Sequence, residues 1–350
     1  KRLVKKKIIG KEKEVNHLTK VARDFNFWIP GRNEVKSKYY FSTGSTLLDL
    51  AIGEGGGIPS GVMSEVSGWE STGKTAIGAA IGGSCQKQGG IVVLYDVEST
   101  FDYRQNALYG LDPEKVLSPP SPPGTIEELF EQIRDFLRKT DEKCYCFIID
   151  SLAALETLEG LSISFSDPTM GTQRAKKFNQ VLRSMPILIQ KKQASLIFIN
   201  QLREKVGQQW GRKETTPGGH AVKFYSSIRI MLKQEGKIKE NKNVIGIDIE
   251  AEVIKNKVGI PYRKAKFPLY FSQGIDDLES CVHFIRENSD SLGNKGGKFI
   301  FDNSFKRVEE KSLVKFLNTL EKEDLVKYIE EMVYILWEEI YSDNRGRINK

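Results

Sequence analysis

Eight consecutive residues carry the residue types and spacing of a phosphate-binding loop. They match the pattern G-x-x-x-x-G-K-[ST] without a mismatch: Gly68, Trp69, Glu70, Ser71, Thr72, Gly73, Lys74 and Thr75. The glycines let the backbone turn tightly, so that successive N–H groups point at phosphate oxygens. Lys74 can then reach the β- and γ-phosphates, and the Thr75 hydroxyl can bind Mg²⁺. The alternative is a chance match in a chain with 31 glycines. The flanks argue against chance because they predict a strand before the loop and a helix after it.

Three further side chains could turn nucleotide binding into hydrolysis. Hydrolysis requires a carboxylate that orients the metal ion and a group that positions the attacking water. Asp150 ends an apolar run, where phosphate-loop enzymes place a Mg²⁺-orienting aspartate. Glu98 follows a second run and is the candidate general base, and Gln201 follows a third and can contact the γ-phosphate. Each could instead be a polar residue that merely ends a strand.

Alternating strands and helices predict the scaffold that brings these residues together. Three continuous apolar runs are typical of central strands in a parallel sheet covered on both faces: 91–96, 145–150 and 195–200. A helix is predicted over 126–139, with two glutamates in its first turn. Three later runs alternate without intervening helices: 228–234, 245–255 and 263–271. We therefore predict an α/β core whose mostly parallel central sheet is extended by antiparallel strands.

The two ends of the chain differ from this core. Residues 1–7 are basic, 12–25 have apolar residues at helical spacing, and 26–31 are aromatic and apolar. So short a helix cannot bury its apolar stripe alone, so we expect it to dock on its own core or on a neighbouring subunit. After about residue 276 the chain is charged and predicted to be helical, notably over 312–320 and 322–341. We divide the chain into three parts: an N-terminal helix and oligomerisation segment (1–38), a core (39–275) and a small helical C-terminal domain (276–350).

Composition limits the classes of function. The net charge of +7 and the isoelectric point near 9.0 are compatible with a polyanionic partner, or with a solvated basic surface. No apolar run approaches the length of a membrane span, and the N-terminus is too basic and polar for a secretory signal, so we expect a cytoplasmic protein. The four cysteines show neither metal-ligand nor disulfide spacing, which favours buried thiols.

A set of short blocks, in a fixed order over residues 42–275, resembles the RecA family of bacterial and bacteriophage recombinases. The blocks are STGS at 42–45, LD at 48–49, GIPSG at 57–61, the phosphate loop, DVE at 96–98, IDSLAAL at 149–155, MG at 170–171, IFINQL at 197–202, ETTPGG at 214–219, KFY at 223–225 and KNK at 255–257. The resemblance implies a RecA-like ATPase that uses ATP and Mg²⁺. It also implies a homo-oligomeric helical filament on single-stranded DNA, which pairs with homologous double-stranded DNA and exchanges strands. Mediator proteins could load such a filament, in a bacterial or phage-infected cell.

The resemblance also assigns roles to single residues. Lys255 and Lys257 would reach across the subunit interface to the neighbour's ATP, and their charge would act in trans as an arginine finger does. Phe224 would transmit the nucleotide state, and Gln201 would couple the γ-phosphate to the loop that follows it. The remaining assignments are interface residue Pro261 and nucleotide contacts Asp102, Gln105 and Phe271. Gln105 stands where the family has an aromatic residue beside the adenine, and Tyr103 could substitute for it.

Two loops are predicted to bind DNA, at about 156–172 and 202–219. The second combines basic residues, glycines and one aromatic residue, a composition suited to phosphate contact and base stacking. Its candidate contacts are Arg203, Lys205, Val206, Trp210, Arg212, Gly218 and Gly219. The resemblance adds Met170 and Gly171 in the first loop. The family's arginines after these residues are not in register here, and Arg174, Lys176, Lys177 or Arg183 could replace them.

Two other functions remain open. The same core could serve a hexameric helicase or DNA-repair ATPase, or a non-catalytic DNA-binding filament protein. The KNK block and the paired glycines at 218–219 favour the recombinase over the motor enzyme, and intact Lys74, Glu98 and Asp150 argue against a vestigial site.

Overall fold

The computed structural model describes most of the chain. The described residues are 19–24, 37–141, 144–162, 170–204, 214–216, 219–288, 298–300, 307–309 and 322–342. The chain falls into two units, residues 1–38 and 39–350. In the first unit, residues 19–24 are helical. The rest of the helix predicted over 12–25, and the aromatic segment 26–31, lie outside the described residues.

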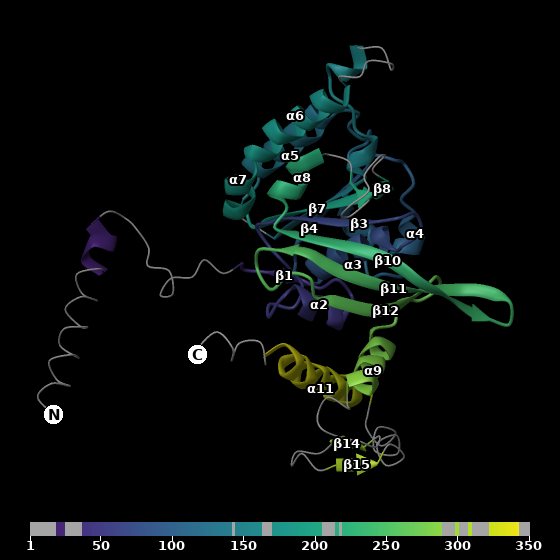
Figure 1. Ribbon diagram of the computed structural model, residues 1–350. Helices are drawn as coiled ribbons and strands as arrows, with labels where there is room; N and C mark the ends of the chain where they lie inside the picture. The colour runs from purple at the N-terminus through teal and green to yellow at the C-terminus, as the bar shows by residue number, and fades with distance from the viewer. Residues whose placement is uncertain are drawn as a thin grey trace, which may run out of the picture. The chain divides into compact units, whose positions relative to one another are not determined.

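A nine-stranded mixed sheet lies at the centre of the second unit. Its strand order is β13-β12-β11-β10-β3-β7-β6-β4-β5 (Figure 1). Its strands are β3 (Met63–Gly68), β4 (Ile91–Asp96), β5 (Val116–Leu117), β6 (Tyr145–Asp150), β7 (Ala194–Gln201), β10 (Ile228–Glu240), β11 (Asn243–Asn256), β12 (Lys264–Tyr270) and β13 (Gly274–Ile275). The strands from β10 to β5 pair in parallel, whereas β10 to β13 pair antiparallel. The predicted fold class, a parallel sheet with an antiparallel extension, is confirmed.

Helices cover both faces of the sheet, and β6 shows how the sequence requires this. Tyr145, Phe147 and Ile149 pack into one hydrophobic cluster, while Cys146 and Ile148 pack into another. Because successive side chains of a strand point to opposite faces, a continuous apolar run needs cover on both sides. Helices α2 (Thr46–Ile52) and α3 (Lys74–Lys87) lie on one face (Figure 1). The other face carries α5 (Ile126–Lys139), α6 (Met170–Arg183), α7 (Pro186–Lys191) and α8 (Gly219–Tyr225).

Helix α5 forms where the sequence predicts it. The Thr125 hydroxyl caps its first turn by accepting the N–H of Glu128, and the Glu128 carboxylate accepts the N–H of Gly124. This reciprocal pair satisfies N–H groups that have no partner inside the helix. Arg138 and Lys139 lie in the last turn, where positive charge interacts favourably with the helix dipole and stabilises the helix.

The part of the chain after residue 276 packs on the core. Helix α11 (Lys322–Ser342) buries Val333 and Trp337 in the same cluster as α2, and the Arg263 guanidinium lies 4.6 Å from the Tyr341 ring centroid. Helix α9 (Asp277–Asn288) packs beside α11. The described residues here also include a strand pair that the sequence did not predict, β14 (Lys298–Ile300) with β15 (Arg307–Glu309). The helix predicted over 312–320 lies outside the described residues, and the domain boundary at 275 stays a prediction.

The remaining short elements connect these layers: β1 (Tyr40–Phe41), β2 (Ile58–Pro59), β8 (Arg203–Glu204), β9 (Glu214–Thr215) and α4 (Tyr103–Ala107). All four cysteines are buried and unbridged, as predicted. Among the described helices, we find none that combines the length and the apolar character of a membrane span.

Candidate functional site

The phosphate-binding loop joins β3 to α3, as the flanking sequence predicts. Gly73 adopts a left-handed conformation, with φ of 79°, and a Cβ there would lie 2.8 Å from Leu269 Cδ2. A Cβ on Gly68 would lie 2.3 Å from Thr72 Oγ1. Both positions therefore require glycine, which is why the spacing of the motif is informative. The loop ends at the N-terminus of α3, whose free N–H groups suit an anion.

Lys74 lies across this loop. Its Nζ donates a 2.6 Å hydrogen bond to the backbone oxygen of Trp69, which also accepts the Thr72 hydroxyl at 2.8 Å. Burial lowers the pKa of Lys74, and the charges of Asp150 and Glu98 oppose that shift. The ammonium thus lies beside the carboxylates at the sheet edge, held by a backbone oxygen that a phosphate could replace.

The predicted hydrolytic residues meet at the carboxyl ends of three parallel strands. Asp150 of β6, Gln201 of β7 and Glu98 just after β4 lie at this edge, in the register that pairs Asp96 with Asp150. Glu98 Oε1 accepts a 3.4 Å hydrogen bond from Gln201 Nε2 and another from the Ser151 hydroxyl. Ser151 is therefore a contact of the candidate base that the sequence did not single out.

Thr75 and Asp150 supply two oxygens that fit a magnesium ion. Thr75 Oγ1 donates a 2.8 Å hydrogen bond to Asp150 Oδ2. Burial raises the pKa of Asp150 to about 6, the bond from Thr75 opposes the shift, and the neighbouring charge of Glu98 adds to it. A buried carboxylate near other carboxylates gains from a nearby cation, and Mg²⁺ prefers oxygen ligands of this kind.

A cavity of about 350 Å³ continues from the phosphate loop toward α4 and the end of β12. Its lining residues are Ser71, Thr72, Gly73, Lys74, Thr75, Ala76, Thr100, Asp102, Gln105, Asn106, Tyr109, Ile247, Leu269 and Phe271. Three predicted nucleotide contacts, Asp102, Gln105 and Phe271, therefore lie around one space. Trp69 and Glu70 are exposed and do not line it.

Two aromatic residues line this cavity, Tyr109 and the predicted contact Phe271, and Tyr103 is not among the lining residues. The Tyr103 ring packs edge-on against Phe101 at 5.1 Å and does not line the cavity. Tyr109 does line it, one helical turn after Gln105, whose Nε2 lies 3.5 Å from the Tyr109 hydroxyl. Tyr109 lies in the turn that follows α4, and its spacing of four residues from Gln105 was the signal that could have identified it. Asp102 caps α4 through the N–H groups of Arg104 and Gln105.

The predicted interface residues lie together, but they do not line the cavity of their own subunit. Lys255 Nζ donates to the backbone oxygens of Lys223 and Phe224, at 2.6 and 2.8 Å. Lys257 Nζ lies 5.8 Å from the Phe224 ring centroid, and Phe224 is 68% exposed. Pro261 lies in the turn that connects β11 to β12, among exposed apolar side chains such as Tyr262. Burial lowers the pKa of Lys255 to about 8, with a further contribution from the charge of Lys257.

The second predicted DNA loop begins directly behind the hydrolytic edge. Leu202, next to Gln201, donates its N–H to the oxygen of Gly68 at 3.1 Å. Strand β8 then pairs with β9, so that Arg203 lies opposite Thr215 at the base of the loop. Arg203 is exposed, and Gly219 begins α8. Five predicted contacts lie outside the described residues: Lys205, Val206, Trp210, Arg212 and Gly218.

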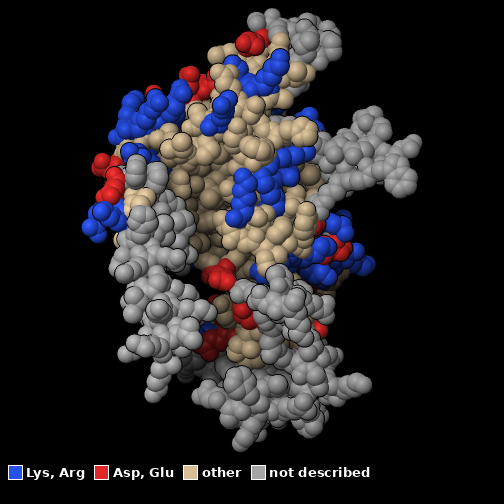
Figure 2. Space-filling model, turned by 60° about the vertical axis from the view of Figure 1, so that its left-hand side comes forward, with Lys and Arg blue, Asp and Glu red and all other residues tan. Residues whose placement is uncertain are grey.

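The first predicted DNA loop is described only at its ends. Met170 and Gly171 begin α6, and the Met170 side chain lies outside the described part. Arg174 points into its own subunit, where its guanidinium donates to the backbone oxygens of Leu152 and Ala153 at 2.9 and 2.6 Å and lies 3.6 Å from Glu156. On the face in Figure 2, Lys and Arg side chains form several separate groups and no continuous stripe. The described residues of this face therefore do not by themselves indicate a DNA-binding surface.

Comparison with known proteins agrees with this arrangement. A family model described as the RecA N-terminal domain matches residues 27–276. Protein RecA of Thermus aquaticus is 38% identical over 242 residues, 69% of this chain and 69% of that protein. Protein RecA of Rhodopirellula baltica is 39% identical over 258 residues, 74% of this chain and 67% of that protein. Protein RecA of Mycoplasma mycoides is 32% identical over 321 residues, 91% of each chain. The matched model spans the phosphate loop, the hydrolytic edge and the strand that carries Lys255, and the chain belongs to the RecA family.

Proposed function

We propose that this protein is an ATP-dependent recombinase, which forms a filament on single-stranded DNA and exchanges strands with a homologous duplex. One observation carries the proposal. Gln201 contacts the candidate base Glu98, and the next residue begins the basic loop whose ends are joined by β8 and β9. Gln201, which would sense the nucleotide, is thus separated by only one residue from Arg203, the first proposed DNA contact.

Each residue of the edge has a role in the proposed hydrolysis. The phosphate loop and the start of α3 bind the triphosphate, and Lys74 leaves the Trp69 oxygen for the β- and γ-phosphates. Glu98 accepts a proton from water as the water oxygen bonds to the γ-phosphorus and the bond to the β-phosphate oxygen breaks. Mg²⁺ held by Thr75 and Asp150 would neutralise phosphate charge. The Gln201 amide, released from Glu98, reports whether a γ-phosphate is present.

Filament formation would complete the site. In the proposed filament, Lys255 and Lys257 leave Phe224 and its neighbours and face the triphosphate of the adjacent subunit. Their charge would stabilise the transition state there, so that hydrolysis depends on assembly. Exposed Phe224, between these lysines and the DNA loop in sequence, suits a surface that an adjacent subunit covers.

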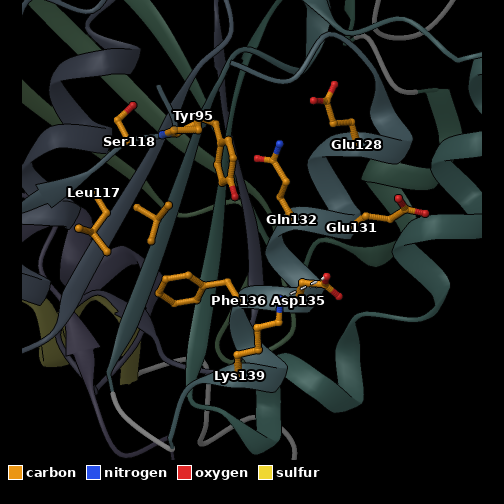
Figure 3. Close-up of a pocket in the computed structure, with 11 residues that line it drawn as sticks. Tyr95, Leu117, Ser118, Glu128, Glu131, Gln132, Asp135, Phe136 and Lys139 are labelled. Carbon is orange, nitrogen blue, oxygen red and sulfur yellow. Dashed lines mark ion pairs between the residues drawn. The ribbon is translucent and has the colours of Figure 1, made fainter. Parts of the chain in front are cut away.

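A groove beside β5, the strand at one lateral edge of the sheet, supports self-association. It has a volume of about 570 Å³ and lies between α5 and the edge strand β5, with an apolar floor that includes Tyr95, Leu117 and Phe136 (Figure 3). Three acidic side chains and one basic side chain surround it: Glu128, Glu131, Asp135 and Lys139, the last of which forms a 3.9 Å ion pair with Asp135. An apolar segment with basic neighbours would match these surfaces, and the N-terminal segment of a second copy has both properties, in residues 26–31 and 1–7. Leu117→Asp should then shorten filaments, whereas Val244→Asp, on the exposed hairpin, should not.

A strand-exchange assay tests the proposed function. Circular single strands, linear homologous duplex and ATP should yield joint molecules, and a heterologous duplex should not. Unwinding of a duplex without joint molecules would instead indicate a motor enzyme. No product with ATP, Mg²⁺ and homologous DNA would contradict the proposal.

A further inference from the structure

Glu65 is a buried carboxylate that the proposed reaction does not use. It lies in the middle of β3, with no exposed surface, and its side chain accepts two hydrogen bonds. Asn200 Nδ2 donates to Oε1 at 2.8 Å, and Arg229 Nε donates to Oε2 at 2.5 Å. Asn200 belongs to β7 and Arg229 to β10, the two neighbours of β3 in the sheet. One carboxylate thus ties together three adjacent strands.

Each partner of Glu65 adjoins a different part of the proposed machinery. Asn200 immediately precedes Gln201, which contacts Glu98 at the hydrolytic edge. Arg229 lies opposite Lys255 in the antiparallel pair of β10 and β11, so the two cations face the same side of the sheet. Lys255 in turn holds the last carbonyls of α8, the helix that follows the second DNA loop. The contacts therefore lead from the nucleotide edge, through Glu65, to the interface lysine.

Stability alone does not explain a charged pair in this position. Two charges removed from water pay a large desolvation penalty, and well-packed apolar residues of similar volume often serve the fold equally well. Two other buried positions of β3, Met63 and Val66, are filled by such apolar residues. The negative charge of Glu65 also partly offsets the positive charge that Arg229 directs at Lys255. Removing Glu65 would change the electrostatic surroundings of a lysine that it does not touch.

We propose that Glu65 is a positioning residue, which couples the Gln201 end of β7 to Arg229 and, through it, to Lys255 and α8. The inference rests on the proposed function, because it concerns how a bound γ-phosphate changes the affinity for single-stranded DNA. A shift of β7 that accompanies movement of Gln201 pulls on Asn200 and hence on Glu65. Arg229 follows, and Lys255 is biased toward or away from the α8 carbonyls.

The test is the ratio of single-strand affinities measured with a non-hydrolysable ATP analogue and with ADP. The variant is the double substitution Glu65→Leu with Arg229→Met, which removes both charges and leaves neither one buried alone. A matched control is Glu250→Leu with Lys264→Met, which removes a 2.7 Å ion pair between β11 and β12 of the same sheet. Nucleotide affinity is measured alongside with a fluorescent ATP analogue.

We expect the double variant to bind nucleotide within about twofold of the wild type, while the ratio of DNA affinities falls about fivefold or more. The control pair should keep the wild-type ratio. If the double variant does not fold, Arg229→Lys keeps the charge, loses the Nε hydrogen bond, and should still lower the ratio. An unchanged ratio in the variant, or an equal loss in the control, would overturn the inference. A wild-type ratio near one would instead contradict the proposed function itself.

Discussion

The Thr75 hydroxyl donates a 2.8 Å hydrogen bond to the carboxylate of Asp150, although the two residues are 75 positions apart. Thr75 is the second residue of α3, behind the phosphate loop, and Asp150 ends β6, the second strand along from β3 in the sheet. Two sequence features that were singled out separately thus bring together two oxygens that could bind Mg²⁺ beside the nucleotide cavity.

Removing the hydroxyl of this pair should weaken magnesium binding. Thr75→Val keeps the shape of the side chain but loses one oxygen, so the apparent Mg²⁺ affinity should fall about tenfold or more. Thr75→Ser retains the oxygen and is the matched control. The measurement is a Mg²⁺ titration of ATP hydrolysis and of nucleotide binding. Equal Mg²⁺ dependence in both variants would show that Thr75 does not bind the ion.

Of the two aromatic residues that line the cavity, Tyr109 and Phe271, we expect Tyr109 to contact the base because it lies beside Gln105. It lines the cavity, whereas Tyr103 packs on Phe101 outside it. Stacking of a base on an aromatic ring contributes on the order of 1–3 kcal/mol, so Tyr109→Leu should weaken ATP binding about fivefold or more. Tyr103→Leu is the control and should bind normally. Titration of a fluorescent ATP analogue distinguishes the two, and a larger loss in Tyr103→Leu would reverse the assignment.

The role of Lys255 in trans can be tested by mixing two inactive variants. Lys74→Ala leaves the phosphate charge uncompensated and should abolish turnover. Lys255→Ala should lose the stimulation of hydrolysis by single-stranded DNA. In a mixed filament, a subunit with Lys74→Ala can still lend its intact Lys255 to the ATP of a neighbour, so the mixture should regain part of the activity.

Two outcomes would contradict action of Lys255 in trans. One is full DNA stimulation in Lys255→Ala alone, and the other is a mixture as inactive as its components. Lys239→Ala, on the exposed hairpin of β10 and β11, controls for the loss of a positive charge and should hydrolyse ATP normally.

Asp49 should make stability depend on pH. Burial raises its pKa from 3.8 to about 6, against opposing hydrogen bonds that include the Thr43 N–H and hydroxyl. The folded-state pKa lies above the unfolded one, so the folded protein favours the protonated form of Asp49. The contribution of this group to the free energy of unfolding is therefore complete below about pH 4 and is lost as the pH rises through 6. Between pH 5 and pH 7 the loss should be about 1 kcal/mol.

The measurement for Asp49 is urea unfolding at both pH values, for the wild type and for Asp49→Asn. The asparagine can accept the same Thr43 N–H but does not titrate. The unfolding free energy of the wild type relative to the variant should therefore fall from pH 5 to pH 7. A constant difference would show that Asp49 is not a buried titrating group.

The sequence was sufficient to predict where those residues of the candidate site lie whose positions follow from local spacing. The phosphate loop is a continuous motif, and the polar residues after β4, β6 and β7 are brought together by the parallel register that continuous apolar runs imply. This also made the mixed sheet predictable. Residue roles in the two DNA loops stay predictions, because many of those side chains lie outside the described part of the chain.

Other parts depend on contacts that no local pattern contains. Glu65 occupies an ordinary position in an alternating strand, and its partners Asn200 and Arg229 are 135 and 164 residues away. The hydrogen bonds that Arg174 donates to the Leu152 and Ala153 carbonyls likewise depend on how α6 packs. Such pairings arise from the order of strands and helices in space, which a single sequence specifies only indirectly.

If the nucleotide site and the DNA loop form one switch, single-stranded DNA should change the rate of ATP hydrolysis, so the key measurement is the ATPase rate with and without single strands. The wild-type protein should hydrolyse ATP slowly alone and much faster when single strands are added. Arg203→Ala, at the base of the loop, should require a higher DNA concentration for the same rate and show a shallower salt dependence. A rate that is unchanged by single-stranded DNA at saturating ATP and Mg²⁺ would show that the nucleotide site and the DNA loop are not coupled.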